Sequence, residues 1–338
     1  MQKLTRSVAL LMVFVIGLWQ PAALSWGEDG HLWINRVAAQ KMPKTMPLFF
    51  RQAVDRLSYL GPEPDRWRNQ NAEPQLKYSQ EADHFFDSEA LPADFGPLPG
   101  DRYKYIKQLY EARQKLLAAG VPEKKADELL PERIGFQPYI TMEVLGRLRV
   151  AFRDYRHLKK EGKPTSLVEG NIITYAGWLG HYVADGSQPL HVTVHHHGWV
   201  GDNPHGYTTD GRFHAWIDGG FIARAHIDFA GLAPQARAAA PVGSGGGPDA
   251  LFRAVMNYLV AQNGRVVPLY ELEKAGKLRA DGSPGSFDGK GFIEEQLLRG
   301  GQMLGSLWLT AWRTAPSDHY LLEQLARRNA AAPAPAGK

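Results

Sequence analysis

The most informative stretch of this 338-residue chain is Gly180-His181-Tyr182-Val183-Ala184-Asp185-Gly186-Ser187-Gln188-Pro189-Leu190-His191. Its first residues lie at the end of an apolar segment, 167–183, whose hydrophobic residues recur at helical spacing. His181 and Asp185 are four residues apart, so both side chains lie on one face of the predicted helix. Gly186 and Pro189 end that helix and turn the chain, which allows His191 to return beside them. The stretch therefore predicts a helix end that gathers ligands for a metal ion.

Helical spacing of apolar residues continues on both sides of this stretch. We predict helices at 103–119, 139–158, 167–183, 213–229, 251–262 and 292–312, most of them bounded by Gly or Pro. No segment has a convincing alternating strand pattern, and there is no internal repeat. The sequence therefore predicts an all-α fold, a single-domain multi-helix bundle with a metal-binding cleft, over residues 26–329.

Two segments contain too few large apolar side chains to pack. Residues 238–248 include a Gly-Ser-Gly-Gly-Gly run, and residues 330–338 alternate Ala and Pro. We expect a surface loop at the first and a disordered tail at the second. The loop does not divide the domain, because the residues that carry chemistry precede it and the closing helix after it resembles core.

Composition limits the possible chemistry. Hydrophobic residues make up 44% of the chain and aromatic residues 11%, which is typical of a globular protein. The chain has no Cys, which excludes disulfides, iron–sulfur clusters, thiol nucleophiles and cysteine zinc fingers. The formal net charge of +4 falls to +2 without Lys3 and Arg6, and so small an excess identifies no nucleic-acid partner.

The first 25 residues have the pattern of a secretory signal peptide. Lys3 and Arg6 precede an uncharged apolar run at 8–19, and Ala23-Leu24-Ser25 places small residues where a signal peptidase reads them. A membrane anchor is the alternative, but the run is shorter than the roughly 20 residues that a spanning helix needs. We expect cleavage after Ser25. Export without Cys is typical of a periplasmic or secreted bacterial protein.

His214 and Asp218 repeat the four-residue spacing on the next predicted helix. One such pair is more often an ordinary helix-face interaction than a metal site. Two pairs and a returning His191 favour a divalent metal, and nitrogen and oxygen ligands without Cys favour zinc or a similar ion. Asp65 and His84 add candidates from predicted loops, where solvated turn residues are the alternative.

These residues resemble the superfamily of zinc-dependent phospholipases C and single-strand-specific nucleases. Its pattern is an amino-terminal Trp soon followed by His, then Asp, His, His-x3-Asp-x5-His and a final His-x3-Asp, and every element occurs in order between Trp26 and Asp218. The resemblance implies three zinc ions. The first would be held by Asp65, His84, His181 and Asp185, the second by His191, His214 and Asp218, and the third by Trp26 and His31, with Asp185 bridging the first and third.

The role implied for Trp26 depends on signal cleavage. A free α-amine titrates near neutral pH, so it can give its lone pair to zinc, while the carbonyl oxygen of the same residue closes a chelate ring. An amide nitrogen cannot do this. We therefore expect the unprocessed chain to lack the third ion.

The resemblance implies hydrolysis of phosphodiesters by a zinc-activated water between the first and third ions. Asp65 would orient the water and Arg68 would bind the phosphate. Phe85 would stack on a base, and Asp87 would be an acid of the substrate site. Arg68 follows Asp65 by three residues and Asp87 follows His84 by three residues, and these spacings are similar to those of the nucleases. The resemblance therefore favours the nuclease branch, with single-stranded DNA or RNA as substrate and 3′-nucleotidase activity as an implied addition. The alternatives are that Arg68 is a solvated charge and that Phe85 belongs to the core with Phe86.

The sequence departs from the nuclease pattern at two places. The nucleases usually carry Gly-Gly-Asn after the position of His191, whereas this chain has a longer segment with histidines at 195–197, for which we expect a solvated loop. They also usually have Thr-Pro after the position of Asp87, where Ser88-Glu89 stands here. A phospholipase C acting on lipid headgroups and a non-catalytic zinc-binding periplasmic protein therefore remain alternatives. No obligate protein partner is implied.

Overall fold

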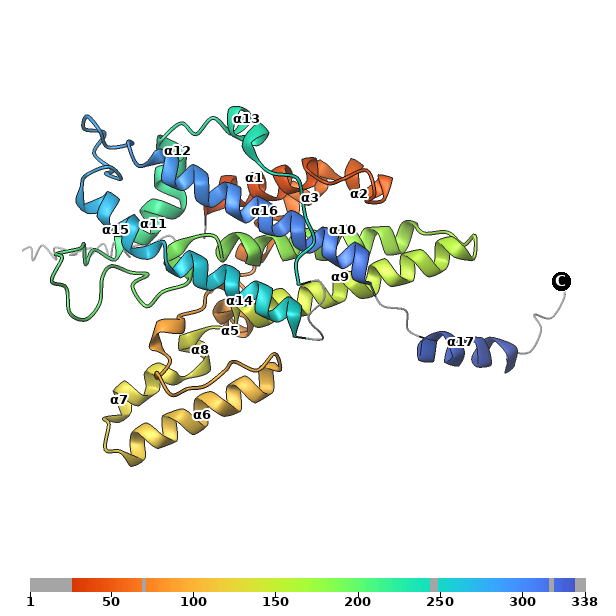
Figure 1. Ribbon diagram of the computed structural model, residues 1–338, viewed down its shortest axis with the longest axis horizontal. Helices are drawn as coiled ribbons and strands as arrows, with labels where there is room; N and C mark the ends of the chain where they lie inside the picture. The colour runs from red at the N-terminus through yellow and green to blue at the C-terminus, as the bar shows by residue number, and fades with distance from the viewer. Residues whose placement is uncertain (1–25, 69–70, 244–248, 316–318, 332–338) are drawn as a thin grey trace, which may run out of the picture.

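The computed structural model describes residues 26–68, 71–243, 249–315 and 319–331. Every regular element within these ranges is helical, so the predicted all-α fold is confirmed. Four helices form the centre: α1 (Gly27–Gln40), α9 (Gln137–Lys160), α10 (Ser166–Asp185) and α16 (Lys290–Thr314). Figure 1 shows α9 and α10 as a long pair that lies beside α16.

The remaining elements precede or follow the candidate metal-ligand segment of α10 in the chain. On the amino-terminal side they are α2 (Leu48–Gln52), α3 (Val54–Leu60), α4 (Glu63–Arg66), α5 (Pro74–Gln80), η1 (Glu81–His84), η2 (Ser88–Ala90), α6 (Arg102–Ala118), α7 (Glu123–Ala126), η3 (Asp127–Leu129) and α8 (Pro131–Ile134). On the carboxyl-terminal side they are η4 (Pro189–His191), α11 (Arg212–Ala215), η5 (Trp216–Phe221), α12 (Ile222–Arg224), α13 (Phe229–Leu232), η6 (Ala233–Gln235), α14 (Ala250–Asn263), α15 (Val266–Lys274) and α17 (His319–Ala331).

Two glycines let α10 approach its neighbours closely. A Cβ on Gly177 would lie 2.3 Å from Cβ of Leu60, and one on Gly180 would lie 1.8 Å from Oδ1 of Asn35. Asn35 Nδ2 donates to the carbonyl oxygens of Leu57, at 2.8 Å, and Gly177, at 3.0 Å. Because any larger residue would push α1 and α3 away, this packing fixes the carboxyl-terminal end of α10 relative to both helices.

Most predicted helices match observed ones within two residues at each end, but the single helix predicted at 213–229 is wrong. The chain there forms α11, then a π-helical turn, η5, then α12, and helix resumes only at α13. Gly219 and Gly220 weaken the α-helix here, since glycine is a poor helix former. A Cβ on Gly220 would lie 2.4 Å from the Trp216 ring, so the turn is packed too tightly for a side chain. Helix α15 was not predicted.

Parts of three predictions lie outside the described residues: the signal peptide at 1–25, residues 244–248 of the predicted loop, and residues 332–338 of the predicted tail. The predicted start of the tail at 330 is wrong, because α17 continues to Ala331. Among the helices that the structure describes, none has both the length and the hydropathy needed to cross a bilayer.

Candidate metal centre

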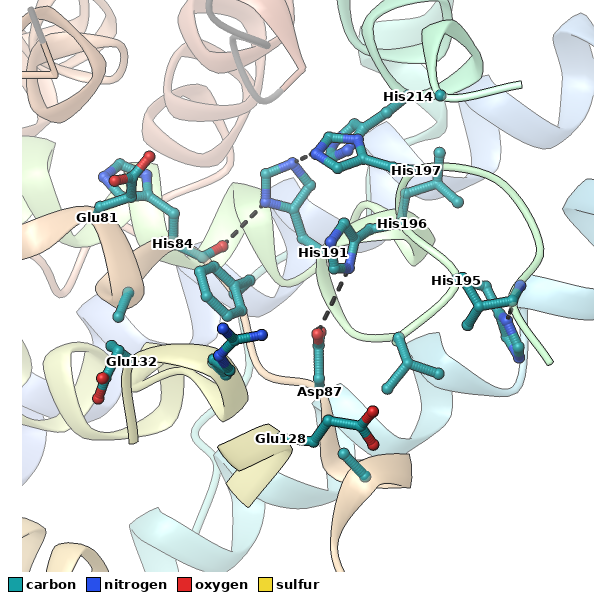
Figure 2. A pocket seen from close by; sticks show the side chains of 18 of the residues that line it. Glu81, His84, Asp87, Glu128, Glu132, His191, His195, His196, His197 and His214 are labelled. Carbon is teal, nitrogen blue, oxygen red and sulfur yellow. Dashed lines mark hydrogen bonds and ion pairs between the residues drawn. The ribbon is translucent and has the colours of Figure 1, made fainter. Parts of the chain in front are cut away.

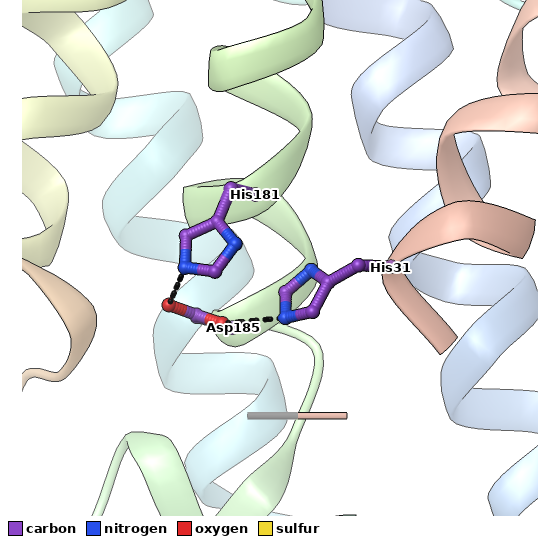
Figure 3. Close-up of side chains that lie close together, drawn as sticks. All are labelled: His31, His181 and Asp185. Atoms are coloured by element: carbon purple, nitrogen blue, oxygen red, sulfur yellow. Dashed lines mark ion pairs between the residues drawn. The ribbon is translucent and has the colours of Figure 1, made fainter. Parts of the chain in front are cut away.

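The carboxyl-terminal end of α10 forms the first buried group of candidate ligands, together with α1. Asp185 Oδ1 lies 3.4 Å from His31 Nε2, and Asp185 Oδ2 lies 3.3 Å from His181 Nε2. Figure 3 shows the carboxylate between the two imidazoles, one from each helix. All three side chains are fully buried. The two oxygens of Asp185 thus face different histidines, which is the arrangement that a bridging carboxylate requires.

A second group shares residues with the first. His84 Nδ1, at the end of η1, lies 2.9 Å from His181 Nε2 and 3.0 Å from Asp185 Oδ2. Asp65 Oδ1, from α4, lies 3.8 Å from both His84 Nδ1 and His181 Nε2. The four residues that the resemblance assigns to the first zinc therefore lie together, with both carboxylates within 4 Å of His84 and His181.

The third group consists of His191 from η4, His214 from α11 and Asp218 from η5. His214 Nε2 lies 3.0 Å from His191 Nε2 and 2.9 Å from Asp218 Oδ2. His191 Nε2 lies 3.7 Å from the same carboxylate oxygen. The π-helical turn that interrupts the predicted helix keeps Asp218 next to His214. Such turns are frequent at functional sites.

Hydrogen bonds hold the second ring nitrogen of three of these five imidazoles. His181 Nδ1 donates to the Gly61 carbonyl oxygen and His191 Nδ1 donates to the His84 carbonyl oxygen, both at 2.9 Å. His84 Nε2 lies 2.6 Å from Gln80 Oε1. Each bond places a proton on the nitrogen that faces away from the group. In the neutral imidazole the lone pair then lies on the inner nitrogen, the one that faces the other ligand candidates, as is common for histidines that bind metals.

The distances in the three groups fit a bound cation. Two inner imidazole nitrogens about 3 Å apart repel each other unless a proton or a cation lies between them. Ligands at the usual zinc–nitrogen distance of about 2.0–2.1 Å in a tetrahedral site lie roughly 3.3 Å from one another. Both nitrogens of His31 are also buried and have no hydrogen-bond partner among the residues that the structure describes, which is costly unless a ligand occupies the site. Three buried groups of His and Asp can therefore hold metal ions.

Electrostatics favours the ligand forms of several of these side chains. Burial lowers the pKa of His31, and burial together with the nearby Arg68 lowers the pKa of His84 to about 3. Both imidazoles are thus neutral at neutral pH and can donate lone pairs. Burial alone would raise the pKa of Asp218, but the contacts with His214 and His191 outweigh it and hold that pKa below its ordinary value. Asp218 is therefore an anionic ligand candidate.

Trp26 is fully buried against the same end of α10. Its indole Nε1 donates to the Ala184 carbonyl oxygen at 2.9 Å and to Ser187 Oγ at 2.8 Å. Ala184 directly precedes Asp185, and Trp26 directly precedes the helix that carries His31. The structure therefore brings Trp26 to the end of the helix that carries the first two groups.

A large open cavity of about 1890 Å³ lies beside these groups. His84, His191 and His214 line it, as Figure 2 shows, and so do the candidate substrate residues Arg68, Phe85 and Asp87. The structure thus gathers all the predicted substrate residues at the candidate metal centre.

The lining of this cavity decides between the alternative roles of Phe85 and of Arg68. Phe85 is half-buried and lines the cavity, while Phe86 is buried in the core, so the aromatic pair divides between the two environments. Arg66 pairs with Glu63 and Glu28 near the surface, whereas Arg68 Nη1 donates to Asp65 Oδ1 at 3.2 Å and faces the cavity. Arg68 is therefore not a solvated charge.

Comparison with protein-family models, with curated proteins and with solved structures gives no match to this chain. Its chemistry is inferred from its own residues and their geometry.

Sequence reasoning missed one residue of this cavity. We expected a solvated loop at 195–197, and His197 is indeed exposed, but His196 Nδ1 lies 3.4 Å from Asp87 Oδ2 and its side chain is 36% exposed. Burial raises the pKa of Asp87, and the His196 contact opposes that effect. The three consecutive histidines close to His191 were the available signal.

Proposed function

We propose that this chain is an exported zinc-dependent phosphodiesterase of the phospholipase C and nuclease superfamily, and that it cuts single-stranded DNA or RNA. The observation that carries the proposal is the convergence of ligand candidates from seven separate elements into three buried groups beside one cavity. Burying so many imidazoles and carboxylates is unfavourable unless they pair with one another or hold ions, and inner ring nitrogens that face each other favour ions. The order of these residues in the chain is that of the superfamily.

The donor sets assign the ions as the resemblance implies. Asp65, His84, His181 and Asp185 would hold the first zinc, His191, His214 and Asp218 the second, and Trp26 and His31 the third, with Asp185 bridging. When bound, closely spaced zinc ions lower the pKa of water and neutralise the charge that develops during phosphodiester cleavage.

The protein groups at the cavity supply binding and orientation. Arg68 presents a planar guanidinium that pairs with two phosphate oxygens at once, which Lys cannot do. Asp65 receives one hydrogen bond from Arg68 on Oδ1, and this fixes the carboxylate for orienting the attacking water. Phe85 offers a ring on which a base stacks, and stacking tolerates any sequence. Single strands alone expose those base faces.

The cavity lining favours a polyanionic substrate over a lipid. Phosphate-binding candidates line it in addition to Arg68: Lys77, Lys125, Arg133 and Arg212. Acidic side chains lie among them, and apolar and aromatic side chains such as Tyr78, Leu190 and Val200 also line the cavity. A lipid enzyme needs an exposed apolar patch with which to enter a bilayer, so it is the five cationic side chains that favour the polynucleotide here.

The proposal is tested with the chain that begins at Trp26, purified and incubated with single-stranded DNA, RNA and phosphatidylcholine micelles, with and without a chelator. We expect both polynucleotides to be cut and the chelator to stop cleavage. Release of diacylglycerol with intact polynucleotides would assign the chain to the lipid branch. Absence of chelator-sensitive turnover on all three substrates would indicate a binding protein.

Gly30 is expected to be essential for the position of Trp26. A Cβ at residue 30 would lie 2.8 Å from Trp26 Cβ, too close for any real contact. We therefore expect Gly30→Ala to displace Trp26 and to remove about one metal ion per chain, as counted by native mass spectrometry.

Gly170→Ala is the matched control, because a Cβ there, on α10, meets nothing within 4 Å. Both substitutions raise helix propensity by a similar amount, roughly 0.5–1 kcal/mol. Equal metal content in the two variants would show that Gly30 does not position the terminal ligand.

A further inference from the structure

The two departures from the nuclease pattern contact each other. Glu89 Oε2 accepts hydrogen bonds from Thr193 Oγ1 at 2.6 Å and from the Val194 backbone N–H at 3.0 Å. Glu89 Oε1 accepts from Asn263 Nδ2 at 2.6 Å, and Asn263 Nδ2 also donates to the Val192 carbonyl oxygen at 2.8 Å. Glu89 therefore anchors the turn at 192–197 to η2 and α14.

This anchored turn places His196 over the substrate side of the cavity. His196 Nδ1 lies 3.1 Å from the Thr193 carbonyl oxygen and 3.4 Å from Asp87 Oδ2. Figure 2 shows the imidazole pointing towards Asp87, while His195 lies apart from the cluster. The His196 and Phe85 rings are 6.4 Å apart between centroids, with 36° between their planes.

The two carboxylate oxygens of Asp87 differ in their contacts. Oδ2 faces His196, whereas Oδ1 is buried and has no hydrogen-bond partner within the described residues. The Asp87 residue is only 4% exposed and borders the cavity. A buried acceptor without a donor is unfavourable, and because Asp87 borders the cavity, a small movement of its side chain would let Oδ1 receive a hydrogen bond from a bound molecule.

We propose that His196 determines the base specificity of this enzyme, by forming with Phe85 the two walls of a slot for a nucleobase and by holding Asp87 at the end of that slot. The inference rests on the proposed function and adds to it a residue outside the superfamily pattern. A base stacked between two rings needs about 7 Å between the planes of those rings, twice the usual carbon–carbon contact distance. The Phe85 and His196 rings must therefore separate only slightly to admit a base. The turn at 193–197 has no helical hydrogen-bond ladder to prevent this.

The acceptor at Asp87 predicts which bases are preferred. Adenine and cytosine present an exocyclic amino group, which donates to a carboxylate oxygen. Uracil and thymine present carbonyl oxygens on the same edge, and these repel a carboxylate. The slot should therefore favour amino-bearing bases over uracil.

The test compares His196→Ala and His196→Phe with the wild-type chain and with His205→Ala. His205 is an exposed histidine of the same long connection, and it does not line the cavity. Values of kcat/KM are measured on poly(A), poly(U) and an oligomer of abasic tetrahydrofuran nucleotides, a diester that carries neither a base nor another aromatic ring. Binding of adenosine and uridine 5′-monophosphates is measured by calorimetry, and bound zinc is counted.

We expect His196→Ala to lower kcat/KM on poly(A) by about 5- to 150-fold, the range reported for one stacked base. Hydrolysis of the base-free diester and the zinc content should stay within twofold of wild type. His196→Phe should retain a wall, and therefore most of the rate, but lose most of the preference for poly(A) over poly(U). His205→Ala should behave as wild type.

An equal loss of kcat/KM on all three substrates would overturn the inference, because it would assign His196 a purely structural role. Unchanged kcat/KM on poly(A) would also overturn it. The binding measurement separates this inference from the proposed function. If the wild-type chain cuts no diester but His196→Ala weakens adenosine monophosphate binding, the catalytic proposal fails and the slot stands. If neither turnover nor nucleotide binding occurs, both fail.

Discussion

Replacement of Asp185 by Asn is expected to remove two metal ions at once and to lower polynucleotide hydrolysis by a factor on the order of 10⁴, comparable to the loss of one member of a catalytic unit. Asp185 Oδ1 faces His31, and Oδ2 faces both His84 and His181. An amide carries no charge and offers one oxygen, so it cannot bridge two cations. Its NH₂ group would also point at one of the imidazoles whose lone pair should hold an ion.

Asp83→Asn is the matched control for this change. Asp83 is also a buried aspartate, but its carboxylate accepts a hydrogen bond from Arg102 at 2.8 Å and belongs to none of the three groups. We expect Asp83→Asn to keep its full metal content even where it lowers thermal stability. An Asp185→Asn chain that retains all its metal, or loses less than tenfold in rate, would disprove the bridging role.

An extra residue that no peptidase can remove, added before Trp26, is expected to abolish binding of the third ion and to lower activity more than about 100-fold. This loss is larger than the usual effect, roughly 10- to 100-fold, of removing a hydrogen bond that supports a metal ligand. The reason is chemical. The nitrogen of Trp26 becomes an amide, whose lone pair is delocalised into the carbonyl and cannot bind a cation. The indole contacts with Ala184 and Ser187 do not depend on that nitrogen, so the fold should remain.

The control for this experiment is the same extra residue added after Lys338, far from Trp26 in the sequence. Thermal unfolding in the presence of chelator should be similar for the two extended chains, and native mass spectrometry should show one ion fewer only for the amino-terminal extension. Equal metal content in the two chains would exclude a terminal amine ligand and would separate signal cleavage from activation.

The local features of the site could be predicted from the sequence because short-range geometry determines them. The four-residue spacing of His181 and Asp185 places both on one helix face whatever the surroundings, and Pro189 ends the helix in any fold. The apolar spacing of α9, α10 and α16 gave their positions closely, because each of these helices buries apolar residues over several turns.

The features that sequence reasoning missed depend on contacts between distant segments. The π-helical turn at Asp218 contains a close approach of Gly220 to the Trp216 ring, which no spacing rule reveals. The place of His196 depends on Glu89, more than one hundred residues earlier, and on Asn263, more than sixty residues later. Asp65 and His84 were only loop candidates in the sequence, since their segments show no ligand spacing of their own, and the resemblance alone implied which ion they hold.

The central claim is that these buried groups hold three zinc ions, and anomalous X-ray diffraction at the zinc absorption edge tests it most directly. The sample is a crystal of the chain that begins at Trp26. We predict three peaks: one among Asp65, His84, His181 and Asp185, one among His191, His214 and Asp218, and one between Trp26 and His31. A crystal grown with zinc that shows no peak at these residues, or peaks only at surface histidines, would contradict the claim.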